Sequence, residues 1–194
     1  MHNNKIKKMA TTALLIALIV ILQLVGGALP TIGGFSISLV LLPIVIGSAM
    51  YGPITGGVLG GAFGMIVFIC CVTGFNPGGA MVFQANPLLC FLVVMGKGTL
   101  CGMAAGAVYK LLANKNAYLA MLCAAIVCPV VNTGVFLLCM LTLFPTVLNA
   151  WASGGDVLAY MISGIVLVNF VPEMLINVVF SPIGQRILHT VNKK

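Results

Sequence analysis

The side chains able to bind or transform a ligand are few in this sequence, and most of them interrupt long apolar segments. Lys97 and Glu173 carry charge there, and Asn132 and Asn169 are the amides that accompany them. Inside a membrane-spanning segment such groups are costly, about 2.5–3.5 kcal/mol for a central Lys or Asp on insertion scales. We therefore expect these side chains to face a partner or a cavity.

One ammonium with several amides around it is suited to holding an anion. We expect Lys97 to meet a substrate group such as a carboxylate, with amides completing the hydrogen bonds. Two further amides stand in a connection rich in Gly, Pro and Asn, from which they could reach the same pocket. The predicted substrate-binding residues are Gln84, Asn86, Lys97, Asn132, Asn169 and Glu173.

Several of these assignments have a competing interpretation. Lys97 and Glu173 could form an ion pair within the membrane that only neutralises both charges, and spacing along the chain does not decide between the two. Trp151 stands in a loop over the expected pocket mouth, where an aromatic belt residue of the membrane interface is also expected. Gln23, near the end of the first apolar segment, is a further polar candidate.

Catalysis and metal binding find little support. A lone glutamate and a lone intramembrane lysine, with no serine–base pair, offer few general acids, bases or nucleophiles. The seven cysteines are odd in number and lie in apolar runs, while His2 and His189 are near the chain ends. The sequence has no Gly-x4-Gly-Lys-Ser/Thr motif, so any energy source is expected outside this chain. We expect no enzyme activity, no metal and no cofactor.

The composition excludes an ordinary soluble protein. Of the 194 residues, 61% are apolar and 6% are charged, against roughly 45–50% and about 25% in soluble domains. Eleven charged side chains cannot solvate the surface of such a chain, so most of that surface must face lipid. The net charge of +7 comes from basic residues in connections and tails, as membrane orientation requires, and does not indicate a nucleic acid partner.

The elements that must position the polar residues are transmembrane helices. Crossing the roughly 30 Å hydrocarbon core takes about 20 residues at 1.5 Å each. We predict one all-α membrane domain over residues 1–194, with six spans. These lie at about 9–25, 37–50, 54–73, 88–112, 119–144 and 157–180, the second being short and broken by Pro43.

Small residues recur at four-residue spacing in three of these segments. Gly56, Gly60 and Gly64 form one such row, and residues 98, 102 and 106 form a second glycine row. Rows of this kind permit close helix approach, here most simply inside the monomer. For Ala13 and Ala17, docking of another protein is an equally good interpretation.

The charge distribution predicts the orientation. With six crossings, eight basic residues fall on one side, and the opposite connections contain no Lys or Arg, so both termini are expected to be cytoplasmic. The eight are Lys5, Lys7, Lys8, Lys110, Lys115, Arg186, Lys193 and Lys194. A cleaved signal peptide at the first span is the alternative, but its removal would leave five spans and reverse the charge pattern.

Four short motifs add up to a family resemblance. They are Ala13-x3-Ala17 after the basic start, Met50-Tyr51-Gly52-Pro53, Cys128-Pro129-Val130-Val131-Asn132-Thr133, and Asn169-x2-Pro172-Glu173-x3-Asn177-x3-Ser181-Pro182. With six spans and no ATPase motif, the chain resembles the substrate-binding S component of energy-coupling factor (ECF) transporters, the vitamin-uptake systems of prokaryotes. It is most similar to the branch that includes riboflavin and pantothenate subunits.

The resemblance implies a multi-pass protein of the prokaryotic plasma membrane that binds one vitamin near its extracellular side. It also implies as partners a transmembrane coupling protein, contacted through Ala13 and Ala17, and two cytosolic ATPases. The loaded subunit would topple in the membrane, and ATP hydrolysis by the partners would reset it. One cation with several amides suits a small hydroxylated carboxylate such as pantothenate better than a large flat flavin.

Two rival functions come from other classes of protein. In the first, the chain is a channel or secondary carrier that works without an ATPase, with Lys97 and Glu173 along an ion path. In the second, it is an assembly subunit without a ligand, and the rows of small residues carry its role. Transport in liposomes without an ATPase would identify the first, and failure of any vitamin to stabilise the protein would favour the second.

Overall fold

The described part of the chain, residues 2–28 and 40–192 of a computed structural model, is built from helices. The prediction of an all-α protein is confirmed for these residues. The elements are α1 (His2–Ala28), α2 (Leu41–Tyr51), α3 (Pro53–Thr73), α4 (Pro77–Ala85), α5 (Pro87–Leu112), α6 (Ala117–Leu143), α7 (Pro145–Trp151), α8 (Val157–Tyr160), the π-helix η1 (Met161–Phe170) and α9 (Val171–Asn192).

The helix starts follow from local chemistry. Proline opens α3, α4, α5 and α7, where its missing N–H is not needed for a helical hydrogen bond. The side chains of Asn76 and Asn86 cap α4 and α5 by accepting hydrogen bonds from the backbone N–H of Gly79 at 2.9 Å and of Leu89 at 3.1 Å. The predicted external connection at 74–87 therefore contains the short, capped helix α4.

Five helical stretches are long and apolar enough to cross a membrane. They are Lys5–Gly27, Pro53–Thr73, Pro87–Leu112, Ala117–Leu143 and Val157–Thr190. They correspond to five of the six predicted spans. The remaining one, 37–50, begins outside the described residues, and its described part is α2, whose eleven residues extend only about 16 Å. Residues 193 and 194, both predicted to be on the cytoplasmic side, also lie outside the described residues.

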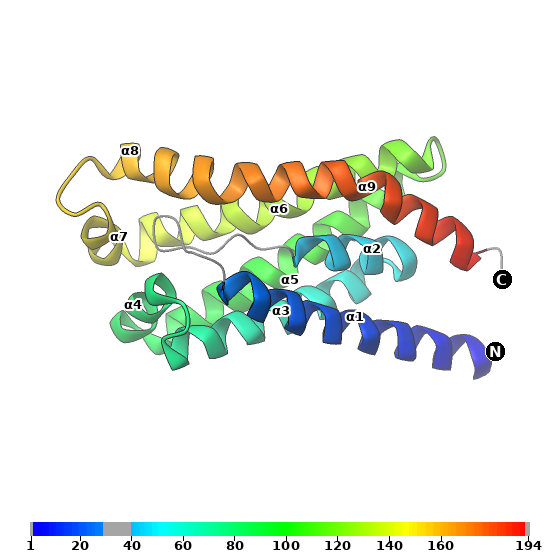
Figure 1. The fold of residues 1–194 in the computed structure, drawn as a ribbon, viewed down its shortest axis with the longest axis horizontal. Helices are drawn as coiled ribbons and strands as arrows, with labels where there is room; N and C mark the ends of the chain where they lie inside the picture. Colours follow the sequence, from blue (N-terminus) through cyan, green and yellow to red (C-terminus); the bar gives the residue numbers. More distant parts are fainter. Residues whose placement is uncertain (1, 29–39, 193–194) are drawn as a thin grey trace.

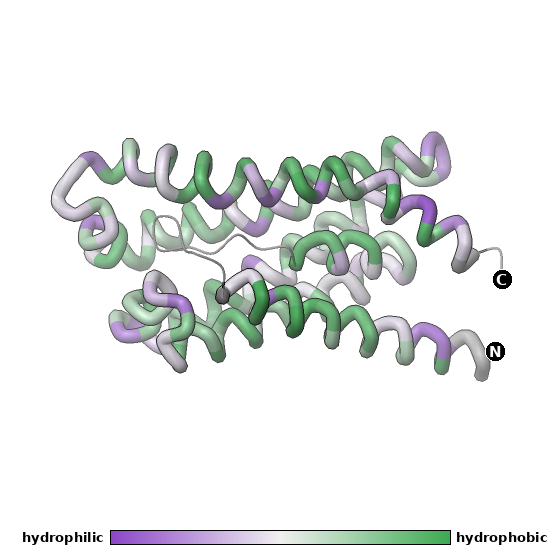
Figure 2. Tube along the Cα trace, viewed as in Figure 1, coloured by the Kyte–Doolittle hydropathy of each residue, from purple (hydrophilic) through white to green (hydrophobic). Residues whose placement is uncertain are grey.

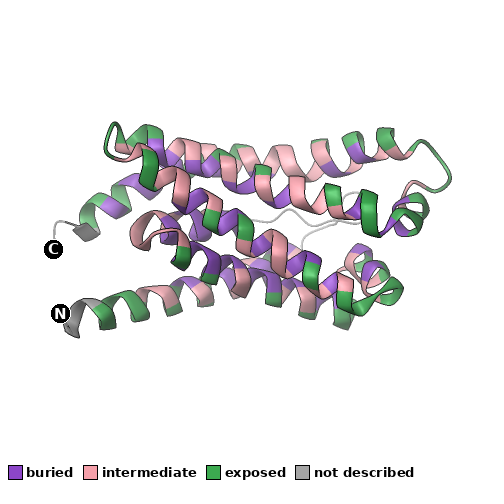
Figure 3. Ribbon diagram, turned by 180° about the vertical axis from the view of Figure 1, so that it is seen from behind, coloured by how far each residue is buried: buried purple, intermediate pink, exposed green. Residues whose placement is uncertain are grey.

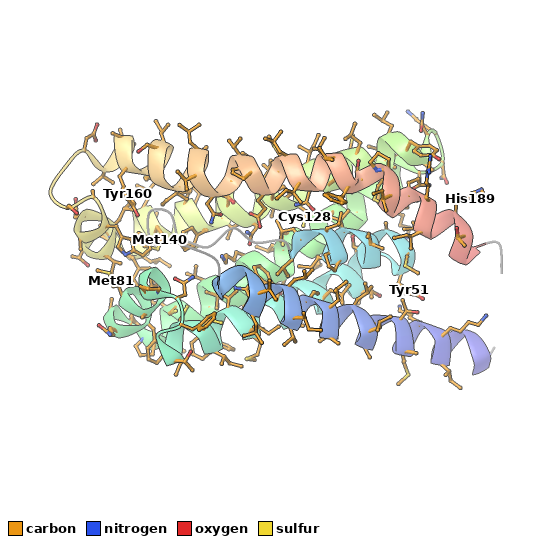
Figure 4. All side chains as sticks on the ribbon, in the orientation of Figure 1. Tyr51, Met81, Cys128, Met140, Tyr160 and His189 are labelled. Atoms are coloured by element: carbon orange, nitrogen blue, oxygen red, sulfur yellow. The ribbon has the colours of Figure 1, made fainter. Side chains whose placement is uncertain are left out.

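The two ends of the bundle differ in character. Both termini lie at one end, and the short helices α4, α7 and α8 gather at the other (Figure 1). Tyr51 and His189 are at the end with the termini, whereas Met81 and Tyr160 are at the far end (Figure 4). Lys8 of α1 and Lys110 of α5 line one groove, so these two predicted same-side charges do share one end of the bundle.

The outer surface of the bundle is apolar. Long stretches of the helices are hydrophobic (Figure 2), and the mean hydropathy is +1.22. Leu14, Ile54 and Leu111 are 70%, 79% and 75% exposed, which a soluble protein avoids over so many positions. Buried residues lie along the inward faces of the helices (Figure 3), where Ile19, Leu59 and others form the core.

The closest helix pair is α3 with α5. A Cβ atom added to Gly60 would overlap the carbonyl oxygen of Gly98, and one added to Gly56 would overlap that of Gly102. The two backbones are therefore in direct contact, as the glycine rows predict. This contact fixes the height and rotation of α5, the helix that carries Lys97.

Candidate functional site

A cavity lies between the helices in the part of the bundle near α4 and α7, and we call it the main cavity because four of the predicted binding residues line it. It holds about 840 Å³ of empty space counted out to its open mouth, the space in that mouth included. Residues of α1, α3, α4, α5, α6, α7, η1 and α9 line it. The polar and charged residues in its wall are Gln23, Asn76, Lys97, Asn132, Thr133, Asn169 and Glu173.

Lys97 reaches the cavity from the middle of α5. Its ammonium nitrogen lies 4.8 Å from the ring centre of Phe136 and 5.8 Å from that of Phe63. Aromatic faces attract a cation through their quadrupole, and they offset part of the hydration that the ammonium has lost. A ring face does not take the place of an oxygen acceptor, so these two contacts do not use the N–H donors of the ammonium.

Asn132 provides a buried acceptor on α6. Its side chain is 6% exposed, and its carbonyl oxygen Oδ1 has no hydrogen-bond partner among the described residues. Leaving such a group unpaired costs about 1–3 kcal/mol. A ligand that donates a hydrogen bond to this oxygen would recover that free energy.

The last long helix supplies Asn169 and Glu173. Asn169 lies near the end of η1, and this π-helix stops two residues before Pro172, which has no N–H to donate. Glu173 is 1% exposed, and its backbone carbonyl accepts a hydrogen bond of 2.9 Å from the amide of Asn177. Glu173 and Lys97 thus bring a carboxylate and an ammonium to one cavity.

An aromatic wall completes the site. Trp151 of α7 stacks on Phe136 of α6, with ring centres 6.5 Å apart and planes inclined by 29°. Trp151 therefore lines the cavity. From the sequence alone, a position in the aromatic belt of the membrane interface is an equally open interpretation. Nothing in the sequence distinguishes Phe63 and Phe136 from the other eight of its ten phenylalanines, because an aromatic ring in an apolar segment has no polar group that must face a cavity.

The predicted site residues divide into two groups. The structure brings Lys97, Asn132, Asn169 and Glu173 together around the cavity, and it adds Gln23, which is 8% exposed.

Gln84 and Asn86 are exposed and do not line this cavity. The side chain of Asn86 is engaged in capping α5, and α4 turns Gly79 and Val82 toward the cavity instead.

The site can bind an organic molecule through a cation, a carboxylate, several amides and aromatic faces. All seven cysteines are free thiols, and two of them, Cys71 and Cys90, line the cavity. Among residues 2–28 and 40–192, no three His, Cys, Asp or Glu side chains lie close enough together to hold a metal ion. A cation, a carboxyl group, amides and aromatic faces in one cavity are the groups by which pockets bind polar small molecules.

The fold is that of a helical membrane protein with a polar-lined cavity between its helices. The chain matches the family described as ECF transporter, substrate-specific component, over residues 7–183, and it belongs to that family. No curated protein matches it. Membership makes the chain a multi-pass membrane subunit that takes up a small-molecule substrate together with an ECF module, whose partner subunits hydrolyse ATP.

Proposed function

We propose that this chain binds a water-soluble vitamin, pantothenate in first place, and carries it across the prokaryotic plasma membrane as the S component of an ECF importer. The observation that carries the proposal is that the Lys97 ammonium and the Asn132 Oδ1 line one cavity, and that this oxygen has no hydrogen-bond partner in the part of the chain that the structure describes. Pantothenate has a carboxylate for the first group and hydroxyl and amide donors for the second. Such charge-assisted bonds are the strong ones in a desolvated site.

The proposed binding residues are Lys97, Asn132, Asn169 and Glu173, joined by Gln23. Glu173 would take hydrogen bonds from hydroxyl groups of the ligand through its carboxyl oxygens. Gln84 and Asn86 are left out of the proposed site, since they do not reach the cavity.

The proposed orientation keeps six crossings and both termini in the cytoplasm. It is supported by Lys8 and Lys110 at the end of the bundle with the termini. The connections at 74–87 and 145–156, which include α4 and α7 beside the cavity, contain no Lys or Arg. By the positive-inside rule the cavity then opens to the exterior, as uptake requires.

The direct test is mass spectrometry of small molecules that co-purify with the tagged protein in mild detergent. We expect near-stoichiometric pantothenate with the parent and none with the Lys97→Met, Asn132→Leu double variant, because both carrying groups are removed. A single different vitamin would overturn pantothenate and leave the S-component role in place. Riboflavin is the first alternative, since the stacked rings of Phe136 and Trp151 offer a face to a flat ring.

The rival function is an ATPase-independent channel or secondary carrier. The observation that favours it is the presence of both Lys97 and Glu173 in one cavity of the bundle. The purified chain in liposomes would then move its substrate without the coupling protein or ATP. Uptake that requires the complete ECF module and ATP would exclude it.

We further propose that Ala13 and Ala17 contact the coupling protein. Both are exposed on α1, four residues apart on one face, while α1 packs on α2 and α3 through its other side. Small residues at this spacing allow a second helix to approach closely. In this arrangement the surface serves assembly and takes no part in vitamin binding.

Adding bulk at this surface is expected to separate assembly from binding. An Ala13→Leu, Ala17→Leu variant should lower ATP-driven uptake by about tenfold, because overpacked helix contacts lose about 1–3 kcal/mol. Binding of the vitamin in detergent should be unchanged. Leu14→Phe, on a neighbouring exposed face, is the control and should transport normally. Normal uptake by the alanine double variant would show that the coupling protein docks elsewhere.

A further inference from the structure

A second hollow lies at the opposite end of the bundle from the cavity, beside the chain termini. It is an open groove between α1, the α2–α3 turn and the end of α5, with about 1,070 Å³ of empty space out to its mouth. The side chains that give it its character are Lys8, Tyr51, Ile54, Tyr109 and Lys110. None of them has a role in the proposed transport site.

The backbone packs closely at the floor of the groove, where the α2–α3 turn meets α5. Gly52, between α2 and α3, adopts a φ of +87°, which L side chains rarely adopt. Gly106 lets α5 approach this turn, since a Cβ there would lie 2.7 Å from Cα of Pro53. Tyr109 forms the far wall, and its hydroxyl donates a hydrogen bond of 3.2 Å to Oε1 of Gln185.

The groove carries positive charge without a compensating acid. The ammonium of Lys8 lies 5.8 Å from the ring centre of Tyr51, which directs this lysine from α1 toward the groove. Lys110 of α5 lines the same groove. The two acidic residues of the chain are elsewhere, Asp156 capping α8 and Glu173 in the main cavity. An anion is therefore the complementary ligand.

The groove lies beside exposed apolar side chains at the end of the spanning helices, which suits a lipid better than a free anion. The spanning stretch of α3 begins at Pro53 and that of α5 ends at Leu112, so the groove lies at headgroup level. Ile54 in the groove and Leu111 beside Lys110 are 79% and 75% exposed, where acyl chains would cover them. Basic pockets between helices at this level bind acidic lipid headgroups.

We propose that this groove is a binding site for an acidic phospholipid of the leaflet on the side of the termini. The phosphate lies between Lys8 and Lys110, and the acyl chains run along Ile54 and Leu111. The bound lipid ties α1 to α5 at one end of the subunit. The site is distinct from the vitamin cavity and does not depend on the identity of the vitamin.

The test is native mass spectrometry of the full chain in detergent, titrated with phosphatidylglycerol or phosphatidylcholine. We expect retained phosphatidylglycerol on the parent and little phosphatidylcholine. Each lysine near the surface contributes about fivefold to affinity for an acidic lipid. Lys8→Gln with Lys110→Gln should therefore weaken phosphatidylglycerol binding by about 25-fold. Lys7→Gln with Lys115→Gln removes the same charge at exposed positions outside the groove, and should have a much smaller effect.

Four outcomes would overturn the proposal. Equal losses in both double variants would show diffuse attraction without a site, and equal retention of phosphatidylcholine would remove the role of charge. Inorganic phosphate that stabilises the chain as well as the lipid does would identify a free-anion site. Unchanged lipid binding with loss of assembly in the groove variant would assign the groove to the coupling protein. Vitamin binding, measured in parallel, verifies that the variants are folded.

Discussion

Replacing Lys97 by methionine is expected to lower the affinity for pantothenate by about a hundredfold. Truncating one partner of a desolvated charge pair costs roughly 2–5 kcal/mol, because the carboxylate of the ligand loses its counter-charge as well as its hydrogen bond. A loss of about 2.8 kcal/mol corresponds to a hundredfold. Methionine has a similar length, so it can occupy the space beside Phe63 and Phe136.

The measurement has a built-in reporter. Trp151 is the only tryptophan of the chain, and it lines the cavity against Phe136. Its fluorescence should therefore change on vitamin binding and give a titration curve for the parent and the variant. Lys115→Met, which removes an exposed lysine outside the cavity, should titrate like the parent.

The same variant distinguishes substrate binding from a purely neutralising ion pair. If Lys97 binds the ligand, the substrate-free variant no longer has to bury an ammonium at membrane depth. Its free energy of unfolding without vitamin should then equal or exceed that of the parent. If Lys97 serves Glu173, the variant leaves a buried carboxylate without its counter-charge and should lose about 3–5 kcal/mol. Parent-like affinity together with such a loss would refute the proposed role of Lys97.

The polar lining of the cavity could be predicted from the sequence, because polar side chains in apolar segments are expected to face a cavity or a partner. Lys97, Asn132, Asn169 and Glu173 meet that criterion, and all four line one cavity. Gln84 and Asn86 do not meet this criterion. They lie in a connection between spans, where a polar side chain can be solvated and has no free-energy cost of burial. Asn86 also precedes a proline, the local pattern of a helix cap, and capping is what its side chain does.

The aromatic residues of the cavity and the π-helix could not be predicted, because neither leaves a distinct signal in the sequence. Phe63 and Phe136 are as expected in the core as at a ligand, so only three-dimensional contacts reveal their place beside Lys97. The five long spans follow from hydropathy and length. The π-helix η1 does not, because a change in hydrogen-bond register leaves the hydrophobic pattern nearly unaltered.

The second large effect is expected at the contact between α3 and α5. A Gly60→Ala substitution places a methyl group against the backbone of Gly98, where its carbonyl carbon would be 2.6 Å away and its oxygen closer still. Backbone cannot rotate out of the way as a side chain does, so the helices must separate. We expect a loss of about 2–3 kcal/mol of stability, or roughly 5–10 °C in the midpoint of thermal unfolding.

The neighbouring Gly61 provides the matched control. A methyl group there would meet only the Thr99 hydroxyl at 3.5 Å and the Met95 terminal carbon at 3.9 Å, which are ordinary contacts. Both substitutions gain the same helix propensity, about 1 kcal/mol over glycine, so the difference between them isolates the backbone contact. Equal stability of the two variants in thermal unfolding would show that α3 and α5 are not in direct contact.

The Gly60→Ala variant should also weaken vitamin binding, although Gly60 does not line the cavity. Gly98 follows Lys97 directly on α5, while Phe63 is one turn beyond Gly60 on α3. Separating the helices therefore moves the ammonium of Lys97 away from the ring of Phe63, now 5.8 Å from it. A titration of Trp151 fluorescence should show a lower affinity in Gly60→Ala and parent-like affinity in Gly61→Ala. Parent-like affinity in both variants would mean that the glycine contact stabilises the bundle without positioning Lys97.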